Sequence, residues 1–193
     1  MRHFRSVAFT TLLTAAALTA GACGEPFGLP RATIPNVVDT VTLFALSGTP
    51  VASPSAYRLE FRQLIRVDQS TENSTFDFAF DIDTAGRPLL LPTGPLKLGR
   101  ASGQQLRVAD FDSVTIAPDR GYSLDSALVL EVGTVAIVHS RPVTCTFGIS
   151  AFYYAKLLVL AIDTTPSGRS VQFQILVNTN CGYRGLAPGV PTR

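Results

Sequence analysis

The chain has 193 residues, of which 46% are hydrophobic and 16% are charged, with 16 Lys and Arg against 14 Asp and Glu, three Cys and no Trp. This composition excludes a disordered or collagen-like chain and predicts one folded domain that can bury a sizeable core. If residues 1–22 are removed, Arg2 and Arg5 go with them and the mature chain is formally neutral. A neutral chain offers no basic surface for nucleic acid or for an anionic membrane.

The first 22 residues have the layout of a secretory signal peptide. Arg2 and Arg5 precede an apolar stretch from Val7 to Ala20, and small residues follow. A helix over that stretch would be about 21 Å long, which is shorter than the roughly 30 Å hydrocarbon core of a bilayer. We therefore expect a cleaved signal peptide and not a transmembrane anchor.

The segment Ala20-Gly21-Ala22-Cys23 resembles the lipobox of bacterial lipoproteins, in which the cysteine receives the lipid and becomes the new N-terminus. The alternative is an ordinary cleaved signal peptide with an unmodified Cys23. Gly24, and not Asp, follows the cysteine, which by the same resemblance favours the outer membrane over the inner one. We expect the Pro- and Gly-rich residues 23–36 to form a flexible tether that precedes a domain over residues 37–193.

Lipidation of Cys23 would leave Cys145 and Cys181 as a pair in an exported, oxidising compartment. We therefore predict a disulfide between them. Zinc binding is the competing interpretation, but two isolated cysteines without a second pair or a nearby histidine do not supply four ligands.

Beyond the tether, apolar residues recur with period two in short blocks separated by Gly, Pro, Asp and Ser. This pattern predicts an all-β domain, a single antiparallel β-sandwich or meander with little helix. The predicted strands cover residues 37–46, 57–66, 76–82, 105–111, 113–116, 128–138, 143–147, 152–162 and 170–177. Strand 128–138 is apolar on both faces, so we expect it to be central. Residues 152–162 also fit a helix, but the alternating segment 170–177 after a turn favours a β-hairpin.

The segment around residue 80 alternates aromatic and acidic residues. Phe76, Phe78 and Phe80 fall on one face of the predicted strand, and Asp77 and Asp81 fall on the other. We expect the phenylalanines to be buried against strand 128–138 and the aspartates to be exposed to solvent.

Asp77, Asp81 and Asp83 share one strand face, and two chemical interpretations compete there with a simple solvated surface. One is a calcium site, although an EF-hand loop starting at Asp81 is excluded because its fifth and twelfth residues are Ala85 and Pro92. The other is a hydrolase that uses a pair of these carboxylates.

The mature chain has one histidine, His139, and contains no G-x-S-x-G, H-E-x-x-H or C-x-x-C motif. No phosphate-binding glycine loop is present either. This scarcity favours a protein without enzymatic activity and without a required cofactor.

Four short segments resemble the HmuY-like lipoproteins over residues 72–177. These segments are FDFAFD at 76–81, GYSLD at 121–125, TVAIVHSR at 134–141 and YAKL at 154–157. The resemblance implies an all-β protein of the cell surface that is associated with haem capture. Haem in that family is held by paired histidines, so here His139 would be one ligand and Tyr122, Tyr153 or Tyr154 the other.

These patterns together predict a lipid-anchored, non-enzymatic binding or structural domain of the bacterial cell envelope. It would meet the membrane only through its lipid, and an envelope protein or a small apolar ligand would be its partner. Capture of haem or another apolar ligand at the cell surface is the first alternative. Hydrolysis by surface carboxylates is the second.

The lipid anchor predicts a simple change in fractionation. Cys23→Ser removes the acceptor of the lipid, so the variant should move from the membrane fraction to the soluble fraction. Mass spectrometry of the mature N-terminus checks the modification directly, and an unmodified Cys23 in the wild-type protein would contradict the prediction.

Overall fold

The computed structural model describes residues 29–67 and 76–192. The predicted signal peptide, Cys23 and the first part of the tether lie outside the described residues. The strands are β1 (Val37–Phe44), β2 (Ala56–Arg58), β3 (Gln63–Ile65), β4 (Phe78–Ile82), β5 (Pro88–Pro92), β6 (Gly103–Arg107), β7 (Leu128–Val129), β8 (Val135–His139), β9 (Val143–Thr144), β10 (Ser150–Ala151), β11 (Tyr154–Asp163) and β12 (Ser170–Asn178). Two short 3-10 helices, η2 (Phe111–Ser113) and η3 (Thr146–Gly148), lie in the connections.

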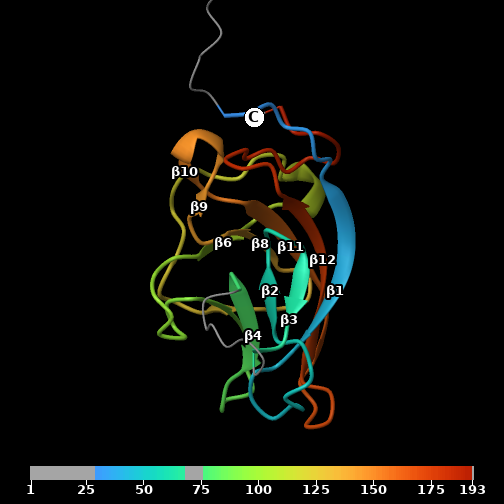
Figure 1. Cartoon of the computed structure of the whole chain (residues 1–193). Coiled ribbons are helices and arrows are strands. Elements are labelled where there is room, and N and C mark those ends of the chain that lie inside the picture. The colour runs from blue at the N-terminus through green and yellow to red at the C-terminus, as the bar shows by residue number, and fades with distance from the viewer. Residues whose placement is uncertain (1–28, 68–75, 193) are drawn as a thin grey trace, which may run out of the picture.

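The strands form two main antiparallel sheets, so the predicted all-β class is confirmed (Figure 1). The long sheet has the order β1-β12-β11-β8-β6, and the short sheet has the order β3-β2-β4-β5-β7. Strands β9 and β10 pair with each other in a separate arm. Within residues 29–67 and 76–192, no helix has the length and apolarity that a membrane crossing needs.

The ambiguous segment 152–162 is a strand, as the hairpin argument predicts. It forms most of β11, which pairs with β12 from Tyr154↔Asn178 to Asp163↔Ser170. A register shift between Val159 and Ala161 marks a bulge in this hairpin. Apart from Lys156, the segment is apolar on both faces because the long sheet is covered on both faces.

The main core lies between the two sheets. It is built by inward-facing residues of β1, β8, β11 and β12 on one side and of β2, β4 and β5 on the other. Phe78 lies at its centre, stacked on Tyr57 with ring centroids 5.5 Å apart and edge-on to Phe173 at 6.5 Å. The prediction that Phe76, Phe78 and Phe80 are buried is confirmed, although Phe76 belongs to a smaller cluster with Ala56 and Ala79.

Two predicted strands are each divided in the structure. Residues 57–66 form the β2–β3 hairpin, in which the Arg62 amide donates to the Leu59 carbonyl and Arg62 itself has a φ of 51°. Residues 128–138 form β7 in the short sheet and β8 in the long sheet, so they are not one central strand. Gly133, with a φ of 89°, lets the chain turn between them.

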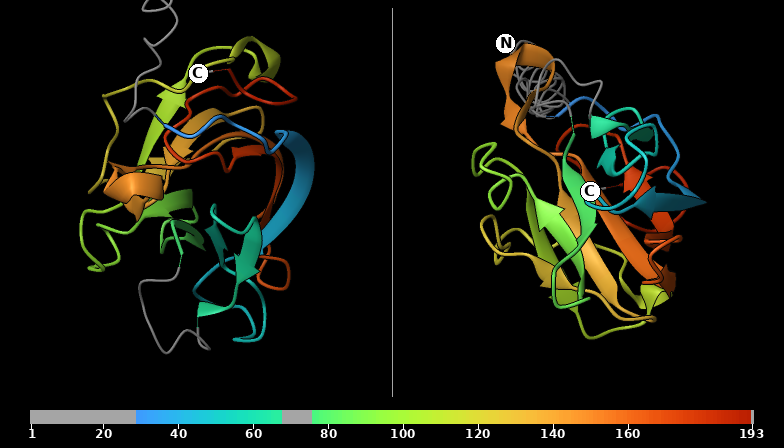
Figure 2. Two further views of the ribbon diagram at one scale, coloured as in Figure 1. Left: turned by 45° about the horizontal axis from the view of Figure 1, so that its top comes forward. Right: turned by 90° about the horizontal axis from the view of Figure 1, so that it is seen from below.

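Other predicted strands are shorter than expected. The segment after β6 leaves the sheet at Arg107 and forms η2, and residues 113–116 contribute only an isolated bridge from Ile116 to Gly185. In place of a sheet, residues 111–122 and 183–187 lie over the outer face of the long sheet. They bury a second cluster there that includes Phe111, Val114 and Leu186, so the long sheet lies between the short sheet and this covering segment (Figure 2).

Asp77 is buried, with 3% of its surface exposed, so the expectation of a solvated aspartate is wrong. Residue 77 lies directly before β4. There its carboxylate accepts hydrogen bonds from the backbone amides of Leu59 at 2.7 Å and Arg141 at 2.9 Å. Asp81 is half-buried, and its carboxylate accepts hydrogen bonds from the amide and hydroxyl groups of Ser47.

Residues 29–36, which we expected to belong to the flexible tether, are held against the domain. Ala32 and Asn36 are buried. The Asn180 side chain accepts hydrogen bonds from the amides of Thr33 and Ile34, each at 3.0 Å. The ordered domain therefore begins before residue 37.

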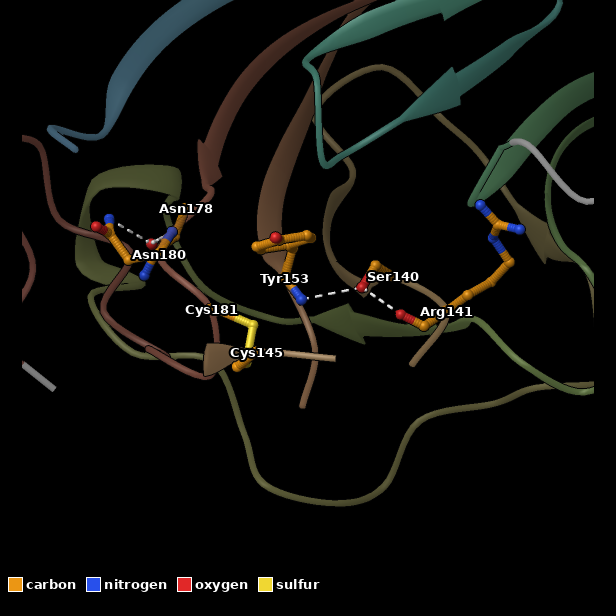
Figure 3. Close-up of a disulfide and its surroundings, with 7 residues drawn as sticks. All are labelled: Ser140, Arg141, Cys145, Tyr153, Asn178, Asn180 and Cys181. Carbon is orange, nitrogen blue, oxygen red and sulfur yellow. Dashed lines mark hydrogen bonds between the residues drawn. A yellow bond between two sulfur atoms is a disulfide. The ribbon is translucent and has the colours of Figure 1, made fainter. Parts of the chain in front are cut away.

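The predicted disulfide between Cys145 and Cys181 is confirmed, with Cα atoms 5.8 Å apart (Figure 3). It joins the β9–β10 arm to the segment after β12. The base of the arm is closed by Ser140, whose hydroxyl oxygen accepts a hydrogen bond from the Tyr153 amide and whose hydroxyl group donates to the Arg141 carbonyl. The arm, the C-terminus and the first described residues lie at the same end of the molecule (Figure 1).

The core packing makes a prediction about stability. Phe78→Ala removes a fully buried ring, so it should lower the free energy of unfolding by about 3–5 kcal/mol. Thermal or denaturant unfolding of the domain measures the loss. Phe61→Ala is the matched control, because the Phe61 ring is 60% exposed and its removal should cost less than about 1 kcal/mol. Equal losses from the two substitutions would contradict this core.

Candidate functional site

The candidate site lies at one end of the long sheet, on its outer face. The register places Gly103, His139 and Tyr154 side by side on β6, β8 and β11. The chain enters the sheet at this same end, since Val37 pairs with Val177 at the neighbouring position. The covering segment and the arm close over this row of residues from two sides.

A cavity of about 330 Å³ lies over this row, and we call it the His139 cavity. This volume is in the range of small-molecule sites in proteins. Its walls are largely aromatic and its mouth is charged. The residues that line it are Arg100, Ala101, Asp119, Arg120, Gly121, Tyr122, Leu124, His139, Pro142, Phe152 and Tyr154.

His139 is 8% exposed and is packed among aromatic rings. Its ring centroid is 4.5 Å from that of Tyr122 and 4.6 Å from that of Phe152, both in edge-to-face geometry. Nδ1 lies 2.7 Å from the Ser140 carbonyl oxygen. Because a carbonyl can only accept, Nδ1 carries the proton and Nε2 presents a lone pair.

The electrostatics of the site favour a neutral imidazole. Burial lowers the pKa of His139, and this effect is larger than the opposing influence of the Ser140 carbonyl and the Asp77 carboxylate. No hydrogen bond to Nε2 is found among residues 29–67 and 76–192. Nε2 is also not one of the side-chain polar atoms that are fully buried without a hydrogen-bond partner. The cavity therefore contains a fixed hydrogen-bond acceptor.

Gly103 makes room for this arrangement. A Cβ atom at that position would lie 2.5 Å from His139 Nε2, 2.6 Å from Leu124 Cδ2 and 2.9 Å from Tyr122 Cβ. Any other residue would push these side chains apart. Gly103 thus lets the imidazole lie directly over the neighbouring strand.

Two tyrosines complete the walls, and both are neutral. Burial raises the pKa of the Tyr122 and Tyr154 hydroxyl groups. The Tyr122 hydroxyl donates to the Pro118 carbonyl at 3.1 Å, whereas the Tyr154 hydroxyl has no hydrogen bond within the described ranges. Tyr154 therefore keeps one donor for a ligand or for water.

Charged residues surround the mouth of the cavity. Arg100 lies 2.6 Å from the Asp125 carboxylate, and Asp119 is shared by Arg120 at 3.5 Å and Arg184 at 4.0 Å. Arg120 and Arg184 also lower the pKa of Asp119, after the larger effect of the hydrogen bond from its own backbone amide. All of these side chains are at least 39% exposed, so the ion pairs are weak and can exchange partners.

The structure brings together some of the residues proposed as haem ligands but not all. His139, Tyr122 and Tyr154 line one cavity. Tyr153 lies on the opposite face of the sheet, packed against the main core, because successive residues of an extended chain point to opposite faces.

The arrangement does not fit a bound haem. The His139 cavity, at about 330 Å³, is at the lower end of the range for small-molecule sites, whereas haem is a large ligand. The rings of Tyr122 and Phe152 contact the imidazole directly, so they occupy the space beside it that a macrocycle would need. The residues are better arranged to contact a smaller molecule.

The three aspartates proposed for calcium binding or hydrolysis have separate partners. Asp77 binds the Leu59 and Arg141 amides, Asp81 binds Ser47, and Asp83 binds the Ala85 and Arg87 amides and the Arg87 guanidinium. In the part of the chain that the structure describes, no three His, Cys, Asp or Glu side chains form a possible metal site. The geometry therefore favours structural roles for these carboxylates.

Several residues of the cavity were missed by sequence reasoning. The sequence indicates Phe152 only as part of a strand, and it carries no signal for Gly103, Arg100 or Arg120. No local pattern identifies them, because the cavity joins residues from four separate segments. Only the aromatic content of FYY at 152–154 hinted at a cluster.

A second hollow, of about 740 Å³, lies between β1 and the β2–β3 hairpin. Its walls include residues of the edge strand β1 and the exposed ring of Phe61. The His139 cavity is the better candidate because it combines buried rings with titratable groups of shifted pKa.

No protein-family model matches this sequence, and no curated protein matches it either.

The buried imidazole predicts a pH dependence of stability. An unfolded chain takes up a proton at His139 near pH 6.5, whereas the folded chain resists it. The unfolded state then binds more protons, so stability should fall as the pH drops below about 6.5, by at most about 1.4 kcal/mol per pH unit.

Denaturant unfolding between about pH 7 and pH 5 measures this slope, and His139→Phe should flatten it. The two proteins are compared because Asp77 also contributes to the slope of stability against pH. Burial raises the pKa of Asp77, so its contribution has the opposite sign to that of His139, and it is present in both proteins. Equal slopes in wild type and variant would contradict a buried neutral imidazole.

Proposed function

We propose that the chain is a lipid-anchored, non-enzymatic protein of the bacterial cell envelope that binds a small, largely apolar ligand in the His139 cavity. One observation carries the proposal. A neutral imidazole with a fixed acceptor atom lies in a cavity whose other walls are mainly aromatic. Apolar walls with a few oriented polar groups are typical of small-molecule sites.

The surroundings of His139 favour binding over catalysis. In a nucleophilic triad, a carboxylate orients the histidine and a hydroxyl or thiol bonds to its other nitrogen. Here a backbone carbonyl orients the ring, and the described residues place no nucleophile at Nε2. Hydrolysis by the aspartates is supported even less, since their oxygen atoms are used in separate local hydrogen bonds.

The position of the cavity agrees with an anchored protein. Five residues separate Cys23 from Leu29, so even a fully extended chain would span only about 20 Å. A lipid on Cys23 would keep this end of the domain close to the membrane surface. The His139 cavity lies at the same end of the long sheet as the point where the chain enters it.

The test uses indole and p-cresol as probes, because each combines an aromatic ring with one hydrogen-bond donor. Both should bind the soluble Cys23→Ser protein in isothermal titration, with dissociation constants in the millimolar range or tighter. Ala101→Phe fills the cavity from its wall and should weaken binding at least about tenfold.

Ala85→Phe is the matched control, because it places the same ring on the exposed β4–β5 turn and should leave binding unchanged. Binding that survives Ala101→Phe, or that is absent from the wild-type protein, would overturn the proposal. Haemin is included as a third probe, since a Soret shift that His139→Phe abolishes would support the haem alternative instead.

A further inference from the structure

We infer that the His139 cavity selects aromatic acids, which bind with a hydrogen-bond donor at His139 and a carboxylate at the arginines of the mouth. The inference rests on the proposed function and adds the chemical class of the ligand. It is based on the difference in polarity and charge between the inner end of the cavity, at His139, and its mouth, at Arg100 and Arg120.

The inner end accepts a donor and disfavours an anion. His139 Nε2 presents a lone pair, and burial favours the neutral imidazole. Burial also keeps the neighbouring tyrosine hydroxyl groups un-ionised. A carboxylate placed here would lose its hydration and meet an acceptor atom. A phenolic O–H or a ring N–H would instead donate to Nε2.

The mouth has the opposite preference. Arg100 and Arg120 both line the cavity. Together with Arg184 they make three guanidinium groups against the two carboxylates of Asp119 and Asp125. Asp119 is shared between two arginines at 3.5 and 4.0 Å, which are long distances for charge-assisted hydrogen bonds. These ion pairs leave an excess of positive charge at the mouth, which a ligand carboxylate would balance.

The ion pairs at the mouth can open for such a ligand. The side chains of Arg120 and Asp119 are 88% and 62% exposed, and exposed pairs of this kind contribute little to stability. A ligand carboxylate can bind Arg120 with two parallel hydrogen bonds, which is the geometry that guanidinium groups prefer. Between the two ends, the rings of Tyr122, Phe152 and Tyr154 offer edges and faces to an aromatic ligand.

The test compares probes that differ at one end only. They are 4-hydroxybenzoate, its neutral amide 4-hydroxybenzamide, and benzoate, which lacks the hydroxyl donor. We expect 4-hydroxybenzoate to bind about tenfold or more tightly than either of the others. Raising the salt concentration from about 0.05 to 0.5 M should weaken the two acids and leave the amide nearly unchanged.

Variants at the mouth test the position of the carboxylate. Arg120→Gln should weaken 4-hydroxybenzoate about tenfold and leave 4-hydroxybenzamide within about twofold. Asp119→Asn should strengthen the acid, because it removes the competitor for Arg120 and Arg184; a purely structural role of Asp119 would not produce this gain. Arg87→Gln, on the β4–β5 turn, is the control and should change neither probe.

The outcomes separate this inference from the proposed function. Equal binding of the acid and the amide, with both lost in Ala101→Phe, would overturn the selection of acids and leave the cavity as the binding site. Failure of indole, p-cresol and all three benzoate probes to bind would overturn both. An acid preference that Arg120→Gln does not change would also reject the mouth as the site of the carboxylate.

Discussion

The structure depends on the long sheet being covered on both of its faces. The short sheet covers the inner face with ordinary aliphatic and aromatic packing. The outer face is covered by a segment with little regular structure, and Lys156 holds that segment in place. Its buried ammonium group donates to the carbonyl oxygens of Phe111 at 2.7 Å and Val114 at 3.0 Å and lies 4.3 Å from the Phe111 ring centroid.

A buried lysine is costly unless its charge is compensated. Burial lowers the pKa of Lys156, and the opposing charge of Asp112 only partly offsets this effect. The two carbonyl oxygens supply the remaining compensation. That of Phe111 also accepts a hydrogen bond from the Val114 amide at 3.3 Å, whereas that of Val114 has no other hydrogen bond among the described residues. One side chain therefore satisfies the Val114 carbonyl, which would otherwise have no hydrogen bond, and it fixes the layer that closes over the outer face.

The His139 cavity arises where this layer ends. Tyr154 and Lys156 point to the same face of β11, so the residue that holds the covering segment is two positions from the wall of the cavity. Asp77 supports the opposite side, because its carboxylate joins the Leu59 amide of the short sheet to the Arg141 amide at the base of the arm. The disulfide ties that arm to the segment after β12. These constraints pre-organise the imidazole, which for the ligand proposed above would reduce the entropy lost on binding.

Much of the architecture could be predicted from the sequence because it follows from local pattern. Alternation with period two determined the strand class and the buried face of Phe78 and Phe80, and a turn followed by an alternating segment determined the β11–β12 hairpin. The pairing of Cys145 with Cys181 followed from the parity of the cysteines and the expected compartment. These arguments need only neighbouring residues or simple counting.

Only the tertiary structure decided which segments meet. The apolar run 128–138 looks continuous, yet Gly133 lets it pass from one sheet to the other, and alternation carries no information on the sheet to which a strand belongs. Asp77 is buried because donors from residues 59 and 141 reach it, and Lys156 is buried because residues 111 and 114 do. The cavity likewise joins residues from four separate segments. Periodicity along the chain encodes the face of a residue, whereas its partner is set by the packing of distant segments, which no short window of sequence contains.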